Sequence, residues 1–558
     1  MHLVDYTTIF VFLLAIVLLT KPLGLMMYSI FEENKKISLL NKFENYFLKI
    51  LKIDKNANMD WKGYTYSLLI FNGIGFLFVF LIQLFQSYLP FNPQNLPNVE
   101  PTLAFNTAVS FMTNTNWQSY SGENTLSYFV QAIGLTVQNF VSAATGIAVF
   151  LSISRGIRNK MTSNLGNFWV DITRTTLFIL LPLSTILAII LVSQGVVQNF
   201  NQYTEIITLE GFKQIIPNGM AASQIAIKQL GTNGGGFFGT NSAFPYENPT
   251  ALSNLFQMLS ILLIPAALTY TYGKIVGSTR QGWTIFSVMI IMLIIGLSVS
   301  LYSEFSMNPN LNIAGNMEGK ETRFGITNSV IWSTATTAAS NGSVNSMHES
   351  LMPLTGMVAM INIMTGEVIF GGVGAGIYGM LVFIILTVFI AGLMIGRTPE
   401  YIGKKIQAKE VQMAIVAVIA PSFVILIFSS IALMIPAGLS RIYESGAHGF
   451  SEVIYAFSSA AGNNGSAFAG LGTNTPFYNI MMGIGMLIGR FAIIIPIMVI
   501  AGSLSIKNKV PTNQGTFRTD DMLFGFLLIS VILVVGALTF LPALSLGPIV
   551  EHLTIILN

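Results

Sequence analysis

The stretch Gly231-Thr232-Asn233-Gly234-Gly235-Gly236 is the clearest of four related motifs that organise this chain. Aligned on one asparagine, the four motifs are Thr115-Asn116-Trp117-Gln118, Thr232-Asn233-Gly234-Gly235, Ser340-Asn341-Gly342-Ser343 and Asn463-Asn464-Gly465-Ser466. A short, mostly uncharged segment rich in small and hydroxyl residues precedes each motif, at 105–112, 223–230, 329–339 and 453–461. Each unit lies between two long apolar runs. We therefore expect the order span, short re-entrant helix, uncharged loop, span to occur four times.

The composition is that of a membrane protein. Of the 558 residues, 53% are hydrophobic and 9% are charged, and the mean hydropathy is +0.67, whereas soluble domains carry about 25% charged residues. The absence of cysteine excludes a disulfide framework, thiolate metal ligands and a cysteine nucleophile. A net charge of +3 is too small to indicate a nucleic-acid partner. No small-residue cleavage site follows the first apolar run, so we interpret that run as a retained span rather than a signal peptide.

Ten apolar runs are long enough to cross a bilayer, which takes about 20 residues in a helix. They lie at about 4–28, 64–88, 126–152, 170–192, 251–272, 283–302, 354–395, 411–435, 477–502 and 522–544. The seventh run is longer than one span and rich in glycine, so we expect it to be broken.

The basic residues predict the orientation of these spans. Most of the 27 Lys and Arg residues lie in alternate loops, at 35–62, 155–160, 274–280, 397–409 and 507–518. The other loops hold only Lys213, Lys320, Arg323 and Arg441. Because cytoplasmic loops are enriched in Lys and Arg, we expect both termini and all four motifs on the extracellular side of a multi-pass protein.

The spans and motifs together predict a fold. We expect an extra N-terminal transmembrane helix (1–29), a cytoplasmic loop (30–63), four pore repeats (64–152, 170–272, 283–395 and 411–502) and a C-terminal transmembrane helix (520–545). Because each repeat crosses the membrane an even number of times, the repeats are parallel and related by an axis along the membrane normal. The predicted fold is an all-α membrane protein with ten transmembrane helices and four channel-like repeats around one pseudo-fourfold axis.

The chemistry of the four motifs suits a dehydrated monovalent cation. Backbone carbonyls can replace the hydration shell of potassium, and glycine permits the unusual dihedral angles that aim carbonyls at one axis. The motifs contain no acidic residue, which argues against a carboxylate ring for divalent ions. We therefore predict that the sixteen motif residues form a potassium selectivity filter, with K⁺ held mainly by backbone carbonyls.

The first motif departs from the other three, because Trp117 aligns with their glycine. Gln118 could supply a side-chain carbonyl to the filter there, or merely cap the loop. A single Asn-Gly pair is a common turn, so the functional interpretation depends on four copies, each between spans.

These motifs and spans resemble those of a known family of potassium transporters. The repeats resemble the superfamily of potassium transporters built from four channel-like units, and the whole chain is similar to the potassium-binding A subunits of Kdp-type potassium-transporting P-type ATPases. Two further segments carry this resemblance, GEVIFGGVG (366–374) and GRTPEYIGKK (396–405). The resemblance implies a bacterial cell membrane, a separate P-type ATPase subunit (KdpB-like) that hydrolyses ATP, KdpC-like and small KdpF-like subunits, and contact with membrane lipid.

Two features inside the spans predict a barrier below the filter. Arg490 lies in the middle of a span, where a charge costs at least about 2.5–3.5 kcal/mol, and the family resemblance places such an arginine below the filter. The segment 367–379, with Glu367, Gly371, Gly372 and Gly374, has too many glycines for a continuous helix. The structural alternatives are an ion pair with another repeat for Arg490 and a packing kink for the glycine-rich segment.

Three other polar residues have simpler explanations. Lys228 lies in the short helix before the second motif, where it could tune the filter potential, but a structural pair with a carboxylate is the favoured interpretation. His348 and His448 fall in outer loops without metal-ligand spacing.

The chain has no apparent energy source. Gly273-Lys274 is followed by Ile275 rather than the Ser or Thr of a phosphate-binding loop, and no Asp-Lys-Thr-Gly phosphorylation motif occurs. We therefore expect no nucleotide site and no catalytic residue, and a channel-like subunit of an ATP-driven potassium uptake complex. The alternatives are a stand-alone potassium channel, an ion-coupled symporter of the same superfamily, and a non-transporting membrane scaffold.

Overall fold

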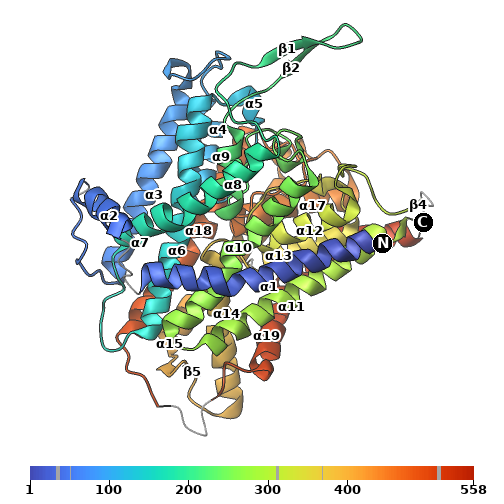
Figure 1. The fold of residues 1–558 in the computed structure, drawn as a ribbon. Helices are drawn as coiled ribbons and strands as arrows, with labels where there is room; N and C mark the ends of the chain where they lie inside the picture. The colour runs from blue at the N-terminus through green and yellow to red at the C-terminus, as the bar shows by residue number, and fades with distance from the viewer. Residues whose placement is uncertain (33–37, 51, 309–312, 367, 512–516, 558) are drawn as a thin grey trace.

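The chain folds into a bundle of long helices around four short ones (Figure 1). The computed structural model describes residues 1–558 except 33–37, 51, 309–312, 367, 512–516 and 558. Within these residues, ten helical segments are long and apolar enough to cross a membrane, which confirms the predicted number. They are α1 (Leu3–Phe31), α3 (Trp61–Leu84), a π-helical turn with α6 (Val130–Thr136, Val137–Arg158), α7 and α8 (Phe168–Thr175, Leu181–Ser193), α10 (Ala251–Val276), α11 (Thr279–Phe305), α14 (Ala375–Ile395), α15 (Ala408–Met434), α18 (Pro476–Ser505), and α19 with α20 (Met522–Leu544, Val550–Leu557).

Local sequence signals set the ends of these helices. Asp60 caps α3 by accepting a hydrogen bond from the Gly63 N–H at 2.9 Å, and Asp521 caps α19 by accepting one from the Phe524 N–H at 2.9 Å. Such caps satisfy backbone donors that a helix N-terminus leaves unpaired. Glycine ends one of the other helices. Helix α10 stops at Gly277, which has a φ of +85°, a left-handed conformation that glycine adopts without steric cost.

Four short helices alternate with the long ones. They are α4 (Pro101–Met112), α9 (Ala221–Leu230), α12 (Gly325–Ala338) and α17 (Gly446–Gly462). Each lies between two of the long helices in sequence and ends directly before one of the four motifs. The span, short helix, loop, span order thus occurs four times, with α1 and α19 outside it.

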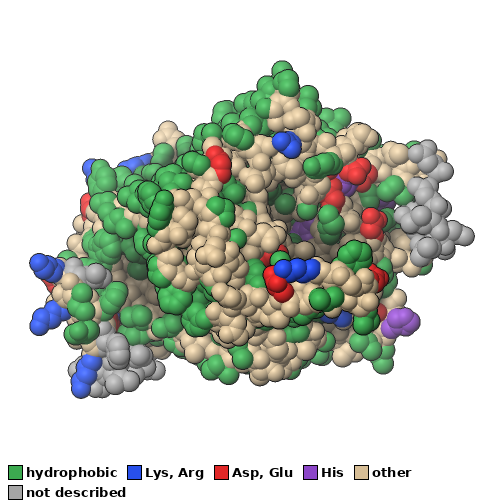
Figure 2. Space-filling view, turned by 90° about the horizontal axis from the view of Figure 1, so that it is seen from above, with side chains coloured by type: hydrophobic (Ala, Val, Ile, Leu, Met, Phe, Trp, Pro, Cys, Tyr) green, Lys and Arg blue, Asp and Glu red, His purple; other side chains and the backbone are tan. Residues whose placement is uncertain are grey.

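The loops between spans gather at two sides of the molecule. The hairpins β1–β2 (Thr204–Ile207, Lys213–Ile216) and β3–β4 (Met307–Asn308, Ile313–Ala314) and both chain termini lie on the upper and right side of Figure 1. Helix α2 (Ser38–Ile50) and the hairpin β5–β6 (Glu400–Tyr401, Lys404–Lys405) lie on the left and lower side. In Figure 2 the Lys and Arg side chains gather mainly at the left end of the view, the side that carries α2.

The segment GRTPEYIGKK forms the β5–β6 turn and holds two spans together. Lys404 is buried, and its Nζ donates hydrogen bonds to the main-chain carbonyls of Asn159, Leu504 and Lys507, the last two at 2.9 and 2.6 Å. Asn159 follows α6 directly, and Leu504 lies in the last turn of α18. One lysine therefore ties together the ends of two spans that belong to different repeats.

Burial differs sharply among the spans. In the most apolar part of each span, 89% of the residues are buried in the segment with α6, but only 28% in each of α1, α3 and α15. The exposed helices therefore form the perimeter of the bundle, and α6 lies at its centre. Helix α1 packs closely along α10, because a β-carbon on Gly24 would lie 2.8 Å from the carbonyl oxygen of Ala267. Glycine at this position permits the close approach.

The seventh apolar run is broken, as the sequence predicts. Helix α13 (Pro353–Met364) covers its first part and α14 (Ala375–Ile395) its second. Between them the described backbone is not helical, and Gly374 has a φ of +86°. Non-helical backbone at membrane depth is tolerated only against protein or water, and here it lies against protein, as described below. Glu367, which the sequence analysis placed in this barrier, lies outside the described residues.

Candidate functional site

The four motifs converge on one ring at the centre of the bundle. Three contacts of the ring are a glycine of one loop against a main-chain carbonyl of the next, and these pairs are Gly234 with Asn341, Gly342 with Asn464, and Gly465 with Thr115. A β-carbon on these glycines would lie 1.6, 2.2 and 2.1 Å from the facing oxygen. The fourth contact joins Gly235 to the side chain of Asn116, whose Cβ lies 3.0 Å from the position of such a β-carbon. Each loop therefore touches the next around a closed circuit.

The backbone of these loops alternates between positive φ and ordinary φ. In the second loop the positive values are 48° at Thr232 and 86° at Gly234. The third and fourth loops repeat the pattern two residues apart, at Ser340 and Gly342 (54° and 78°) and at Asn463 and Gly465 (58° and 99°). In the first loop the positive values fall at Asn114 and Asn116 (69° and 52°), one place earlier than the asparagine alignment predicts.

Backbone hydrogen bonds fix the register of the first loop. In every loop one N–H donates to the carbonyl five residues earlier, in the last turns of the short helix. The four bonds are Thr115 to Ser110 (2.9 Å), Asn233 to Lys228 (2.8 Å), Asn341 to Thr336 (3.1 Å) and Asn464 to Ser459 (2.9 Å). Thr115 therefore corresponds to the three asparagines, and Asn116 to their glycines.

The alignment of Asn116 with the other three asparagines was thus wrong by one residue. Asparagine tolerates a left-handed backbone better than most residues with a β-carbon, so Asn116 can replace glycine where Trp117 could not. Gln118 caps the neighbouring loop. Its Nε2 donates to the Gly236 carbonyl at 3.0 Å, and its Oε1 accepts from the Gly236 N–H at 2.8 Å.

Side chains tie each loop to its neighbour and leave carbonyls available. Asn341 Nδ2 donates to the Lys228 carbonyl at 3.0 Å, and Asn464 Nδ2 donates to the Thr336 carbonyl at 3.0 Å. Within the described part of the chain, the carbonyls of Thr115, Asn233 and Asn341 accept no hydrogen bond. The site therefore offers neutral oxygen ligands, the chemistry that replaces the hydration shell of a monovalent cation.

The short helices reinforce this chemistry. Helices α4, α9, α12 and α17 all end immediately before the ring. Each helix C-terminus carries a partial negative charge. The ring therefore lies at the meeting point of four helix ends that favour a cation.

Lys228 is a structural residue behind the second loop. It is completely buried and forms an ion pair with Glu247, and its Nζ also donates to Asn241 Oδ1 at 2.7 Å. Asn241 Nδ2 in turn donates to the Gly234 carbonyl at 2.8 Å. The predicted carboxylate partner of Lys228 is therefore Glu247. Through Asn241 the pair anchors the segment that follows the second motif.

The glycine-rich segment after the broken span lies directly against the ring. The Val373 N–H donates to Thr232 Oγ1 at 2.9 Å, and a β-carbon on Gly372 would lie 3.3 Å from Cβ of Ser340. Gly374 packs on α6, because its β-carbon would lie 2.1 Å from the carbonyl oxygen of Gly146. Within the segment, Gly376 packs against Gly371. A β-carbon on Gly376 would lie 2.4 Å from the Gly371 nitrogen.

Arg490 lies beside the same segment. It is 7% exposed, and its Nη2 donates to the Ser142 carbonyl of α6 at 3.3 Å. A β-carbon on Gly146, the glycine that Gly374 touches, would lie 3.5 Å from this Nη2. No carboxylate of the residues that the structure describes forms an ion pair with Arg490. The inter-repeat ion pair considered as an alternative is therefore not present among them.

Sequence reasoning missed a polar cluster behind the first two loops. Asn114 Oδ1 accepts hydrogen bonds from Ser142 Oγ at 2.8 Å and from Asn233 Nδ2 at 2.5 Å. Asn116 Nδ2 donates to Asn139 Oδ1 at 2.7 Å. Asn139 and Ser142 stand out as polar residues in the apolar run 126–152, and this signal could have identified them.

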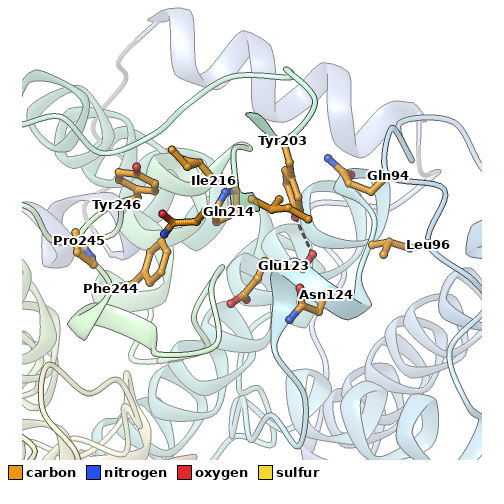
Figure 3. A pocket seen from close by; sticks show the side chains of 12 residues that line it. Gln94, Leu96, Glu123, Asn124, Tyr203, Gln214, Ile216, Phe244, Pro245 and Tyr246 are labelled. Carbon is orange, nitrogen blue, oxygen red and sulfur yellow. Dashed lines mark hydrogen bonds between the residues drawn. The ribbon is translucent and has the colours of Figure 1, made fainter. Parts of the chain in front are cut away.

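A cavity of about 670 Å³ lies between segments of the first two repeats (Figure 3). Its wall includes Glu123, Tyr203, Gln214 and Phe244, and the Tyr203 hydroxyl donates to the Glu123 carbonyl at 2.9 Å. None of the sixteen motif residues lines it. The cavity is therefore separate from the ring.

Comparisons with known proteins agree over the whole chain. A family model described as potassium-transporting ATPase A subunit matches residues 10–553. The chain is 53% identical to the potassium-transporting ATPase potassium-binding subunit of Leptospira interrogans, with 99% of each chain covered. It is 55% identical to the protein of that name from Pseudomonas fluorescens, with 99% of this chain and all of the relative covered.

A solved structure supports the fold. The potassium transporter TrkH from Vibrio parahaemolyticus matches with a TM-score of 0.51 at 13% identity, covering 88% of this chain and 95% of that one. At this identity the likeness shows the architecture alone. With a family match over nearly all of its length and relatives above half identity, the chain belongs to the family of potassium-transporting ATPase A subunits.

Proposed function

We propose that this chain is the potassium-binding and translocating subunit of an ATP-driven, high-affinity potassium uptake complex. The observation that carries the proposal is the ring in which Gly234, Gly342 and Gly465 each face a carbonyl of the next loop. Family membership and the names of the relatives support potassium as the ion. The ring then acts as a selectivity filter, because carbonyl oxygens supply the coordination that water gives up.

The sixteen motif residues form this filter in the proposal, with one change of register. The ring position that glycine fills in three loops belongs to Asn116 in the first loop, and Trp117 lies one place further along. K⁺ binds mainly to main-chain oxygens. Thr115, Asn233 and Asn341 provide carbonyls without a competing hydrogen bond in the described residues.

Below the filter, the segment with Gly371, Gly372 and Gly374 acts with Arg490 as a barrier. The segment touches the filter loops at Thr232 and Ser340, and the guanidinium adds a positive charge beside it. Among the described residues this guanidinium has no carboxylate partner, and a fixed positive charge repels a potassium ion that continues along the axis. The ion then leaves sideways, into a partner subunit. Glu367, the first residue of the barrier segment predicted from the sequence, lies outside the described residues and stays a prediction.

Energy enters through that partner in the proposal. The sequence holds neither a phosphorylation motif nor a phosphate-binding loop, so ATP hydrolysis belongs to a P-type ATPase subunit (KdpB-like). KdpC-like and small KdpF-like subunits complete the complex, and the exposed apolar faces of α1, α3 and α15 suit lipid or such partners.

The proposed location is the bacterial cell membrane with both termini extracellular. The charge distribution supports this orientation, because Lys and Arg gather mainly at the end that carries α2 (Figure 2). The filter ring then opens to the outside, which suits uptake.

One experiment separates this function from a stand-alone channel or symporter. ATPase activity is measured on the full chain, affinity-purified in mild detergent with the subunits that bind it, with potassium or sodium added. Stimulation by potassium alone supports the pump subunit. A folded chain that purifies without ATPase activity, and that alone passes potassium in liposomes, supports the channel or symporter, an architecture that the likeness to TrkH keeps open.

A further inference from the structure

A second polar cluster lies away from the filter, where two segments distant in sequence meet. Glu349 belongs to a short 3₁₀ turn (His348–Ser350), and His448 and Glu452 lie on the first half of α17. One ligand atom from each of these three side chains lies within 4.8 Å of the others.

Glu452 is the unusual member of the cluster. Its side chain is fully buried, and neither carboxylate oxygen has a well-oriented hydrogen-bond donor among the described residues, although the Glu349 carboxyl group and the Glu444 backbone lie near it. A buried carboxylate without a partner is costly unless a proton or a cation compensates it. Glycine at position 470 leaves space in front of it, because a β-carbon there would lie 2.4 Å from Glu452 Oε1 and 2.9 Å from Glu349 Oε1. The structure therefore keeps room beside two carboxylate oxygens.

The surrounding residues orient the other two ligands. His448 Nδ1 lies 2.8 Å from Glu551 Oε1, while its Nε2 lies 2.7 Å from Glu349 Oε1. Glu349 Oε2 accepts a hydrogen bond from the Gly470 N–H at 2.8 Å. In metal sites, histidine typically donates its second N–H to a carboxylate, and such contacts fix the ring for coordination. Glu551 stands in that position here.

We propose that Glu349, His448 and Glu452 bind a divalent transition-metal ion of the zinc class. The ligands would be one imidazole nitrogen and two carboxylate oxygens, with water at the remaining position. Zinc accepts this mixture in a tetrahedral site that is open at one corner. The imidazole disfavours calcium and magnesium, which take oxygen ligands. Binding does not depend on the potassium site.

Metal binding at this cluster releases protons. A metal ion binds the deprotonated form of a carboxylate or an imidazole, so it competes with protons for Glu349, His448 and Glu452. The affinity for the metal therefore rises with pH.

A stack of rings connects this site to the filter. His448 stacks on Phe468 with centroids 5.7 Å apart and planes 7° apart, and Phe468 stacks on Tyr455 at 4.4 Å and 21°. The Tyr455 hydroxyl lies 2.8 Å from Ser466 Oγ of the fourth loop. A metal at the cluster would therefore sit on the short helix that ends at the ring.

The test is calorimetric titration of ZnCl₂ into the full chain, purified with its bound subunits and first treated with a chelator. We expect about one zinc per chain, bound more tightly at about pH 8 than at about pH 6. Zinc should bind at least about tenfold more weakly to Glu452→Gln and to His448→Gln. It should bind about 10–100-fold more weakly to Glu551→Gln. Glu444→Gln and His552→Gln are matched controls, because they remove an acid four residues before His448 and the histidine next to Glu551 in sequence. Both variants should bind zinc as the unaltered chain does.

Two results would overturn the proposal: no zinc binding by the unaltered chain, or equal binding by the cluster and control variants. If the cluster variants do not fold, the unaltered chain still decides, because Co²⁺ in a nitrogen and oxygen site of four ligands gives visible absorption bands. A chain that titrates with Co²⁺ without such bands lacks the site.

Discussion

The N–H of Val373 donates a hydrogen bond of 2.9 Å to Oγ1 of Thr232. This single contact joins the glycine-rich break of the third repeat to the filter loop of the second. It places the proposed barrier directly against the proposed filter, so the two are mechanically connected rather than separate elements along a pore.

Removal of this contact should loosen the barrier. In Thr232→Val the shape of the side chain is kept, but the buried Val373 N–H is left unpaired, at a cost of about 1–3 kcal/mol. We expect a faster passive potassium flux through the chain in liposomes and a lower ratio of transport to ATP hydrolysis. Thr232→Ser, which keeps the hydroxyl, is the control and should behave as the unaltered chain. Equal fluxes in both variants would contradict a barrier held by Thr232.

Gly234→Ala should damage ion selection. The new β-carbon would lie 1.6 Å from the Asn341 carbonyl oxygen, and the φ of 86° is itself unfavourable for alanine. The potassium concentration for half-maximal ATPase stimulation should rise at least about tenfold, or about 1.4 kcal/mol, and sodium should begin to stimulate.

Gly277→Ala separates backbone strain from the steric effect. Gly277 has a φ of 85°, but no heavy atom lies within 4 Å of its missing β-carbon. This control should lose some stability and keep its potassium dependence. If Gly234→Ala and Gly277→Ala have the same potassium dependence, the ring is not the selective element.

Arg490→Gln should raise potassium leak without unfolding the chain. A charge at mid-span costs at least about 2.5–3.5 kcal/mol, so its removal should leave the thermal unfolding temperature unchanged or higher. Passive ⁸⁶Rb⁺ flux in liposomes and a thermal melt measure the two effects separately. A lower melting temperature with no leak would favour a structural role. Arg441→Gln, at an exposed arginine, is the control for loss of one positive charge.

The Lys228–Glu247 pair should behave as a buried structural pair. Lys228→Met leaves the Glu247 carboxylate buried without its cation, at a cost of about 3–5 kcal/mol. Glu247 Oε1 also accepts hydrogen bonds from the Phe237 and Phe238 N–H groups at 2.6 and 2.9 Å, and glutamine can keep these. The double variant Lys228→Met with Glu247→Gln should therefore recover much of the stability in thermal unfolding. No recovery would mean that Lys228 contributes through other contacts.

The His448 interactions should give a measurable pH dependence. Hydrogen bonds to Glu349 and Glu551 raise the pKa of His448 to about 10, from about 6.5 in an unfolded chain. The charged imidazole therefore stabilises the folded chain fully below about pH 6.5, and this stabilisation is lost as the pH rises through about 10. The difference in unfolding temperature between the unaltered chain and His448→Gln, measured with chelator present, should therefore shrink steadily from about pH 6 to about pH 10. A constant difference would show that the imidazole is not charged in the folded chain.

The periodic features of the sequence were enough to predict the architecture. Runs of about 20 apolar residues depend on bilayer thickness alone, so all ten spans could be found without tertiary information. The break in the seventh run could be predicted from glycine content, because it is a local property of the backbone.

The register of the first loop could not be predicted in the same way. Side-chain identity suggested Asn116 as the partner of the other asparagines, but the hydrogen bond from Thr115 to Ser110 sets the register. Both Asn and Gly tolerate positive φ, so the sequence alone allowed either alignment. The partner of Lys228 and the polar residues behind the loops depend on contacts between segments far apart in sequence, for which a single sequence carries no pattern.

The closed ring lies within one polypeptide, and this has a consequence for the cell. A channel assembled from four separate chains needs three association steps, and a shortage of chains leaves incomplete assemblies. Here the contact between Gly465 and Thr115 closes the circuit between the last and first repeats of a single molecule. Each completed round of translation therefore yields one whole ring, and the number of such rings in the membrane follows directly from the number of chains synthesised.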